Sequence, residues 1–376
     1  MRVALIHDWL TGMRGGERVL EALLDLFQGA EIFTLLHKPG SVSRRIESRP
    51  IHVSALSHVP GAHRRYRWAL PIFPNLIERF DLRDFDLVIS SSHCVAKGVR
   101  VPAEIPHLCY CHTPMRYVWD QFANYFGPGR ASLPLRLAAG LAAPRLRRWD
   151  VRTARRVTAF VANSHYVRDR IRRYYGRDAD VIAPPVDVDR FVAAAQREDF
   201  YVCVSALVPY KRLDIAVEAF RRNGRRLVIV GEGPERARLG RRGSPDIVFS
   251  GRVDDSEVAD LLGRARAFVM PGEEDFGIAA VEAQAAGAPV IALGRGGALE
   301  TVIDSDDRRS ATGVLYGEPS AEALCQAIAR FEPMDFDAVA LRRNAERFRP
   351  ERFRERMQEK VAALVLSPSA ACASPT

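Results

Sequence analysis

The sequence predicts an α/β protein built from two doubly wound domains in series, and three observations predict it. The chain has 376 residues, more than one hydrophobic core usually organises. Short apolar runs alternate with amphipathic helical patterns, which is typical of βαβ units around a parallel sheet. The alternation stops once, at a segment with paired prolines, and then begins again. We therefore expect one such domain on each side of that segment.

The first domain is expected over residues 1–183. After the first strand we expect a glycine-containing turn and a helix over 17–27 (ERVLEALLDLF). Five apolar runs are the predicted strands: 2–8 (RVALIHD), 30–36 (AEIFTLL), 85–92 (FDLVISSS), 106–112 (PHLCYCH) and 157–164 (VTAFVANS).

Residues 180–191 (DVIAPPVDVDRF) are expected to connect the domains, and the second domain is expected over 184–348. Residues 349–376 are expected to form a helix that packs back toward the first domain, followed by a frayed tail. The strands predicted for the second domain are 200–207, 226–233, 246–253, 267–272 and 288–293. The predicted helices are 212–220, 256–265, the stretch after Phe276, 320–331 and 350–366.

Composition limits the possible classes of protein. Apolar residues make up 47% and charged residues 27%, which is typical of a soluble globular protein and not of a disordered one. A net charge of +9 predicts an anionic partner, either nucleic acid, a phosphorylated ligand or an acidic membrane face. We expect no membrane span and no signal peptide. The six cysteines are scattered except for Cys109 and Cys111, whose spacing matches no zinc pair, so a reducing, cytoplasmic location is expected.

The segment 270–292, MPGEEDFGIAAVEAQAAGAPVIA, holds the first candidate site residues. Glu274 lies beyond the carboxyl end of a predicted strand. Glu282 lies about a turn and a half inside the helix that follows, whose first free N–H groups can face an anion. An isolated pair of glutamates eight apart is more commonly a solvated acidic cluster favoured by the helix dipole. The wider context therefore decides between the two interpretations.

That context resembles the signature of retaining glycosyltransferases of family 4, E-x-F-G followed by a second Glu and EAMA-x-G-x-P-V. The likeness continues, in the family's order, through VSALVPYKRLDIAVEAF, LVIVGEGPE, VFSGRVDDSEVADLLGRA and GGALETV. It is weaker in the first half, at the Gly-Gly turn, CHTPMRYVW and VANSHYVRDRI, and covers about Arg2 to Phe348. The resemblance implies the GT-B fold, two Rossmann-like domains facing across a cleft, with the sugar nucleotide held mainly by the second.

The resemblance also implies residue roles in the second domain. Glu274 would contact hydroxyls of the donor sugar and Glu282 the ribose, since a carboxylate accepts two hydroxyl bonds at once. Lys211 would neutralise the leaving diphosphate; the alternative is a solvated pair with Arg212 at a helix start. Where the family has Gly-Arg this chain has Ser205-Ala206, and Arg212 is the candidate replacement for the missing cation. The other donor-binding candidates are Gly231, Arg252, Val253, Phe276, Gly277 and Ile278.

In the first domain the candidates are glycines and a histidine. Gly15 and Gly16 let backbone approach a ligand, and the resemblance places them beside the diphosphate and acceptor; the alternative is a tight turn. They do not form G-x-G-x-x-G, so a dehydrogenase is not expected. His112, after a predicted strand, matches the histidine near the reaction centre of related mannosyltransferases, and Arg116 is a weaker candidate. Asn163-Ser164 either borders the cleft or caps the following helix.

Two basic stretches bear on the acceptor. Residues 63–74 interleave arginines with aromatic residues, and 130–156 hold eight arginines against one acid, Asp150, with leucines at near-helical spacing. Such stretches fit a helix lying on an anionic membrane, where a polyprenyl-diphosphate-linked acceptor would reside. Arginines solvated around an ordinary amphipathic helix are the equal alternative. No nucleic-acid-binding module is recognised, so no nucleic-acid partner is expected.

The resemblance implies a retaining transferase that moves a hexose to a glycan or lipid-linked oligosaccharide, and the likeness of CHTPMRYVW implies GDP-mannose as the expected donor. No Asp-x-Asp metal motif stands out and basic residues can take its place, so a metal-independent reaction without a cofactor is expected. A UDP-hexose or UDP-N-acetylhexosamine donor stays open. A GT-B sugar-nucleotide epimerase and a non-catalytic nucleotide-sugar-binding protein are the alternatives, the latter favoured only by Ala206.

Overall fold

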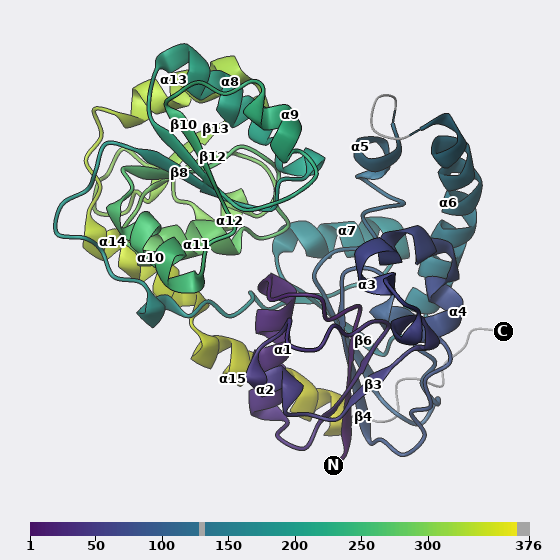
Figure 1. Cartoon of the computed structure of the whole chain (residues 1–376). Helices are drawn as coiled ribbons and strands as arrows, with labels where there is room; N and C mark the ends of the chain where they lie inside the picture. The colour runs from purple at the N-terminus through teal and green to yellow at the C-terminus, as the bar shows by residue number, and fades with distance from the viewer. Residues whose placement is uncertain (128–131, 367–376) are drawn as a thin grey trace. The chain divides into compact units, whose positions relative to one another are not determined.

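The computed structural model describes residues 1–127 and 132–366, except for the side chains of residues 64, 65, 67 and 68. The tail expected to fray, 367–376, lies outside the described residues. The chain divides into two compact units (Figure 1). Unit 1 holds Met1–Pro185 together with the residues from Glu351 onward, and unit 2 holds Val186–Pro350.

In the described residues of unit 1, seven parallel strands form one sheet in the order β3-β2-β1-β4-β5-β6-β7. The strands are β1 Val3–His7, β2 Glu31–Thr34, β3 Ile51–Val53, β4 Leu87–Ser92, β5 His107–Cys111, β6 Ala159–Ala162 and β7 Asp180–Val181. The α-helices are α1 Gly15–Leu26, α2 Arg44–Glu47, α3 Ala62–Arg65, α4 Phe73–Ile77, α5 Phe122–Phe126, α6 Leu133–Ala154, α7 His165–Tyr175 and α15 Pro350–Leu366. Short 3-10 turns are η1 Ala55–His58, η2 Tyr66–Ile72 and η3 Ala96–Gly98.

The last helix, α15, completes the core of unit 1. Phe353, Met357 and Val361 recur every four residues, so they share one face, and all three are buried. They join the cluster that holds the strand residues Leu5 and Leu108. This core is therefore built from the two ends of the sequence.

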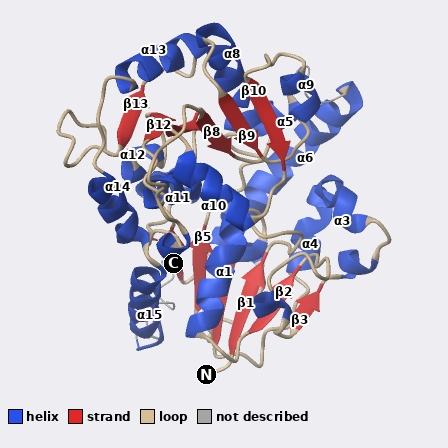
Figure 2. Ribbon diagram, turned by 60° about the vertical axis from the view of Figure 1, so that its left-hand side comes forward, coloured by secondary structure: helices blue, strands red, loops and turns tan. Residues whose placement is uncertain are grey.

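Unit 2, all of whose residues are described, has a parallel sheet in the order β10-β9-β8-β11-β12-β13 (Figure 2). Its strands are β8 Tyr201–Val204, β9 Leu227–Val230, β10 Ile247–Gly251, β11 Ala267–Met270, β12 Val290–Leu293 and β13 Gly313–Tyr316. Its α-helices are α8 Leu213–Asn223, α9 Arg236–Gly240, α10 Asp255–Arg264, α11 Ile278–Ala285, α12 Ala298–Thr301, α13 Ala321–Phe331 and α14 Ala338–Ala345. The 3-10 turns are η4 Val188–Arg190, η5 Pro209–Lys211 and η6 Glu346–Phe348.

The predicted doubly wound α/β class is confirmed, and each of the ten predicted strands is present. The structure adds β3, β7 and β13, which the apolar pattern did not mark. The segment 180–191 is corrected at its start, because Asp180 and Val181 pair with β6 instead of leaving the sheet. In both units the strand order reverses, between β1 and β4 and between β8 and β11. Ligands of such sheets bind beyond the carboxyl ends of the strands at this point.

Candidate functional site

Three loops of unit 2 touch one another beyond the carboxyl ends of β8, β11 and β12. A Cβ on Gly272 would lie 2.7 Å from the carbonyl oxygen of Lys211, and one on Gly297 would lie 2.3 Å from Cα of Phe276. Only glycine fits such approaches. The Gly297 N–H also donates to the carbonyl of Glu274 at 2.8 Å. The backbones of the three loops thus pack directly against one another at the point where the strand order reverses.

This packing brings the side chains of Lys211 and Glu274 together. The Lys211 ammonium donates to Oε1 of Glu274, and the two side chains are 19% and 17% exposed. At such partial burial the attraction is less screened than on an open surface. The neighbouring Arg212 has φ +51°, a left-handed conformation, and its Nε donates to Oδ1 of Asp214 at 3.2 Å. The cation predicted to bind the phosphate and the carboxylate predicted to bind the sugar are therefore in contact, and both are partly exposed to solvent.

The helix after Glu274 begins at Ile278, one residue after Gly277, whose φ is +92°. The Phe276 ring is buried and packs edge-on against Phe348, with ring centroids 5.2 Å apart, so the backbone of this residue and not its ring can reach a ligand. Oε1 of Glu282 accepts a hydrogen bond from Arg190 at 3.1 Å. Sequence reasoning missed Arg190, because nothing distinguishes this arginine of the connecting segment from the many others.

The remaining donor candidates lie on the loops after β9 and β10. Gly231 has φ +132°, and a Cβ there would lie 2.0 Å from the Ser205 carbonyl oxygen. Its N–H donates to the carbonyl of Gly251 at 2.7 Å. Arg252 is exposed and Val253 half-buried, directly after β10. Packing between these loops therefore requires the glycine whether or not a ligand binds.

In unit 1 the carboxyl ends of β1, β4 and β5 bring His7, Ser91 and His112 together. Oγ of Ser91 lies 2.8 Å from Nε2 of His112 and 3.1 Å from Nδ1 of His7. From the end of β6, Asn163 donates to the carbonyl of His112 at 3.1 Å. His112 is thus one end of a hydrogen-bonded row, His7–Ser91–His112, and it is the only member of the row that the sequence predicted as a site residue.

The row is continued by Glu17 in α1. Oε1 of Glu17 lies 3.7 Å from Nε2 of His7, and both side chains are buried. Burial alone would raise the pKa of Glu17, but His7 and the charge of Arg14 outweigh it and hold this pKa below its usual value. Gly15 and Gly16 form the first turn of α1, not a turn before the helix. A Cβ on Gly16 would lie 3.7 Å from Nε2 of His112.

A buried carboxylate, Asp8, organises the loop after β4. It accepts hydrogen bonds from four successive backbone N–H groups, those of residues 93–96, at 2.6–2.9 Å. Each of the two carboxylate oxygens accepts two of these hydrogen bonds, so the buried group is satisfied. The arrangement fixes His93, whose ring meets Trp9 edge-on with centroids 4.4 Å apart. Asp8 therefore positions this wall of the site.

The other predicted positions have structural roles or lie nearby. Ser164 caps α7 by accepting a hydrogen bond from the N–H of Val167 at 3.0 Å, as the capping alternative predicted. Arg116 is half-buried four residues after His112. Cys109 and Cys111 are buried in β5, and burial raises the pKa of the Cys111 thiol well above its usual value. The described cysteines are free thiols.

None of the helices in the described ranges is long and apolar enough to cross a bilayer. Across the same ranges, no group of three or more histidine, cysteine, aspartate or glutamate side chains is arranged to hold a metal ion. The metal-independent reaction stays a prediction.

Comparison with family models now identifies the chain. Residues 13–190 match the model described as Glycosyltransferase Family 4, and residues 187–348 match the one described as Glycosyl transferases group 1. Together the two matches run from residue 13 to residue 348. The chain belongs to the family 4 glycosyltransferases.

Curated relatives carry more specific names. A GDP-mannose-dependent alpha-(1-6)-phosphatidylinositol monomannoside mannosyltransferase of Mycobacterium tuberculosis is 34% identical over 205 residues, which cover 46% of this chain and 51% of the relative. The enzyme of the same name from Mycolicibacterium smegmatis is 32% identical over 204 residues, 46% of this chain and 52% of the relative. The chain spans about half the length of the curated relatives it matches.

Solved structures show the fold. Anabaena HepE in complex with UDP and glucose superposes with a TM-score of 0.69 at 17% identity, over 96% of this chain and 99% of that one. Sucrose-phosphate synthase of Thermosynechococcus elongatus superposes with a TM-score of 0.70 at 19% identity, over 98% and 100%. With the two parallel-sheet units, these likenesses confirm the predicted GT-B fold.

Proposed function

We propose that this family 4 glycosyltransferase transfers mannose from GDP-mannose, with retention of configuration, to a glycan or lipid-linked oligosaccharide on the cytoplasmic side of a membrane. The observation that carries the proposal is the contact of Lys211 with Glu274 where the strand order of unit 2 reverses. The names of the curated relatives support the donor. The free thiols of the described cysteines, four of them buried, favour a reducing compartment.

In the proposed donor site, Lys211 meets the diphosphate. Breaking the glycosyl–diphosphate bond adds negative charge to the leaving group, so a fixed cation stabilises the transition state more than the ground state. Glu274 accepts hydrogen bonds from hydroxyls of the sugar. Glu282 accepts hydrogen bonds from the two ribose hydroxyls, and Arg190 donates a hydrogen bond that fixes the Glu282 carboxylate. The backbone N–H groups of Gly277 and Ile278, at the start of α11, face the phosphate or sugar.

On the acceptor side, His112 is proposed to contact the sugar near the reaction centre. Ser91 and His7 orient its ring through their row of contacts. Retention follows if the leaving phosphate and the acceptor occupy the same face of the sugar, because the phosphate oxygen then takes the acceptor's proton. No strong general base is needed for that step, and the residues proposed here perform it without a metal ion.

A UDP-sugar donor is the main alternative, and it has one supporting observation in the UDP-bound Anabaena structure of the same fold. An epimerase or a non-catalytic binding protein would also bind a sugar nucleotide but would transfer nothing. Ala206, which stands where the family carries an arginine, is the feature that favours the non-catalytic alternative.

A thermal-shift panel tests the donor. A ligand that binds only the native state at 100 times its dissociation constant stabilises it by about 2.7 kcal/mol. GDP-mannose and GDP should raise the melting temperature of the wild type, and should do so much less for Lys211→Ala. A rise with UDP-sugars alone would overturn the GDP-mannose assignment. Absence of any rise with either class would overturn the transferase proposal.

A further inference from the structure

One face of α6 changes from apolar to basic along the axis of the helix. Leu133, Leu137 and Leu141 lie four residues apart and are 62%, 61% and 71% exposed. The same face continues with the exposed Arg148, Arg152 and Arg155. The sequence left two equal interpretations, a helix lying on a membrane and a solvated amphipathic helix, and both would place apolar and basic residues on opposite sides of the helix. In α6 the exposed apolar residues lie at the N-terminal end of the helix and the exposed basic residues at the C-terminal end, on the same face.

The basic half of this face has no acidic partner among the residues that the structure describes. Arg145, Arg148, Arg152 and Arg155 form no ion pair with an acid within the described part of the chain, whereas the neighbouring Arg156 pairs with Glu78 at 3.3 Å. Arg148, Arg152 and Arg155 also line a hollow of about 370 Å³ together with Trp119. No acid occurs between Asp120 and Asp150. These guanidinium groups are therefore suited to bind phosphate groups.

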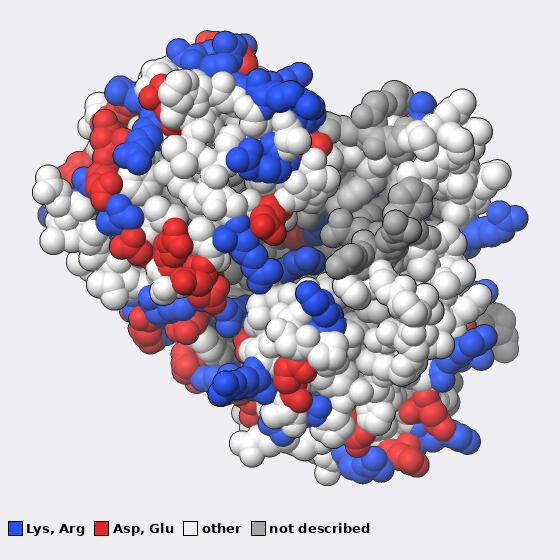
Figure 3. Space-filling model, in the orientation of Figure 1, with Lys and Arg blue, Asp and Glu red and all other residues white. Residues whose placement is uncertain are grey.

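The apolar half lies beside α5 and is largely uncharged. Between Gln121 and Pro144 the sequence contains two charged residues, Arg130 and Arg136, and both are basic. Figure 3 shows a largely uncharged surface where the first half of α6 lies, with basic side chains farther along the same edge. An arginine such as Arg136 can extend its head toward a polar layer while its stem stays in apolar surroundings.

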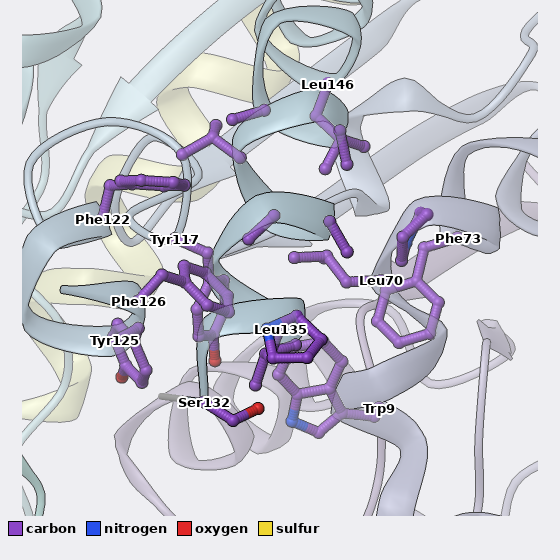
Figure 4. Close-up of a pocket in the computed structure, with 17 residues that line it drawn as sticks. Trp9, Leu70, Phe73, Tyr117, Phe122, Tyr125, Phe126, Ser132, Leu135 and Leu146 are labelled. Atoms are coloured by element: carbon purple, nitrogen blue, oxygen red, sulfur yellow. The ribbon is translucent and has the colours of Figure 1, made fainter. Parts of the chain in front are cut away.

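The opposite face of the same half of α6 borders an apolar pocket of about 500 Å³. Figure 4 shows the rings of α5 on one side of α6 and Leu70 and Phe73 on the other. Trp9 lines the pocket, its ring meets His93 edge-on, and the rings of His93 and His112 lie 6.4 Å apart between centroids. Trp9 thus contacts both the pocket and the histidines at the edge of the sheet.

We propose that α5 and the apolar end of α6 enter an anionic lipid bilayer end-on, and that the pocket holds one hydrocarbon chain of a lipid. The leucines then lie among acyl chains, and the arginines farther along the face meet lipid phosphates. Burial of apolar side chains and attraction to anionic headgroups act together in such binding. A lipid seated in this way directs its headgroup from Trp9 toward His112, which would make it the acceptor. That last step rests on the proposed function; the membrane contact does not.

Vesicle co-sedimentation with full-length protein tests the surface. Wild type should bind vesicles of phosphatidylglycerol and phosphatidylcholine and should bind pure phosphatidylcholine vesicles much less. Leu137→Gln/Leu141→Gln and Arg148→Gln/Arg152→Gln should each weaken partitioning by about tenfold or more. The matched controls Val192→Gln/Val339→Gln and Arg241→Gln/Arg242→Gln change exposed residues of unit 2 and should bind as wild type does. Equal binding by wild type and both α6 variants would contradict the proposal that this surface of α6 binds membranes.

A depth measurement separates end-on entry from a helix lying flat. An environment-sensitive fluorophore is attached at Leu137→Cys or at Arg152→Cys, in a background with Cys325→Ser and Cys372→Ser. End-on entry predicts a blue shift and protection from an aqueous quencher at position 137, with position 152 still quenched. Equal protection at both positions would show a flat helix and overturn the proposal.

The pocket is tested with a lipid whose acyl chain carries bromine atoms, which quench nearby tryptophan fluorescence. Added as monomer below its micelle concentration, it should quench Trp9, and Ala139→Phe, which fills the pocket without adding a tryptophan, should weaken binding of that lipid about tenfold. Unchanged binding by Ala139→Phe would remove the pocket from the proposal. Because none of the three lipid assays uses a sugar nucleotide, loss of lipid binding and loss of the GDP-mannose thermal shift report failures of two different proposals.

Discussion

At the scale of single residues, His112 depends on partners that are distant in sequence. Ser91 lies 2.8 Å from its Nε2, and Ser91 also lies 3.1 Å from Nδ1 of His7. Glu17 contacts the far nitrogen of His7 at 3.7 Å. Such a row restrains the ring orientation of the terminal histidine and decides which nitrogen carries a proton. We therefore assign Ser91 a positioning role.

Ser91→Ala should lower the turnover of mannose transfer about tenfold, a typical cost of losing one orienting hydrogen bond, and leave the affinity for GDP unchanged. The pH profile of turnover should also change, because Nε2 of His112 loses its hydrogen-bond partner Ser91. Ser90→Ala is the matched control, since this serine contacts His107 on the other side of β4. An unchanged turnover and pH profile in Ser91→Ala would remove the positioning role.

His107 predicts a pH dependence of stability. The ring is buried in β5, and burial lowers its pKa from 6.5 in the unfolded chain to about 3. The folded state therefore binds fewer protons than the unfolded state between these values, so the stabilisation is complete above pH 6.5 and is lost as the pH falls toward 3. At pH 5 the loss attributable to this residue is about 2 kcal/mol.

Urea denaturation at pH 7.5 and pH 5, followed by tryptophan fluorescence, checks the sign. The difference in unfolding free energy between the two pH values should be about 2 kcal/mol smaller in His107→Gln than in wild type. The same difference in both proteins would show that His107 is not held neutral by the fold.

Sequence reasoning reached His112 but not Ser91, His7 or Glu17. His112 follows a recognisable apolar run and lies in a motif. Ser91 sits in a run of three serines that has no marked spacing, and its contacts arise because β1, β4 and β5 pair in one particular register. Register between strands more than 80 residues apart is a tertiary property. Single residues of the site could thus be predicted, and their partners could not.

At the scale of elements, the loops of unit 2 depend on glycines. A Cβ at position 297 would meet the backbone of Phe276 at 2.3 Å, and backbone cannot rotate away as a side chain can. Gly297→Ala should therefore destabilise unit 2 by about 1–3 kcal/mol and abolish the thermal shift caused by GDP-mannose. Gly317→Ala, where nothing lies within 4 Å of the added atom, should do neither. Circular-dichroism melting with and without the ligand makes the comparison, and equal behaviour of the two variants would contradict it.

The elements that the sequence predicted are those with a long or wholly apolar pattern. Strands β1 and β5 are buried at every residue, so they appear as continuous apolar runs. The unpredicted β7 is two residues long, and β3 has a half-exposed pattern at the sheet edge. Edge strands gain their conformation from one neighbour and need little apolar character. Local pattern therefore could not separate them from loops.

At the scale of the whole molecule, unit 1 is completed by a helix that follows the rest of its sequence only after the whole of unit 2, Val186–Pro350. Met357 of α15 is fully buried in the core that holds Leu5. Because truncating a buried side chain leaves a cavity, Met357→Ala should destabilise unit 1 by about 2–5 kcal/mol. All four tryptophans belong to unit 1, so their fluorescence reports this unit specifically.

Urea denaturation monitored by tryptophan fluorescence measures that effect. The exposed Glu359→Ala on the same helix is the control and should leave the transition in place. If Met357→Ala also leaves the tryptophan transition unchanged, α15 does not contribute to the stability of unit 1.

The most direct test of the whole account is mannose release and transfer from GDP-mannose by three purified proteins. Glu274 contacts Lys211, whereas its neighbour Glu273 is assigned no role in the reaction. Wild type and Glu273→Gln should turn over the donor at similar rates, and Glu274→Gln should be slower by about 100-fold or more, the usual loss when one group that stabilises a transition state is removed. Equal turnover by Glu274→Gln and wild type, or no turnover of GDP-mannose by any of the three, would contradict the account.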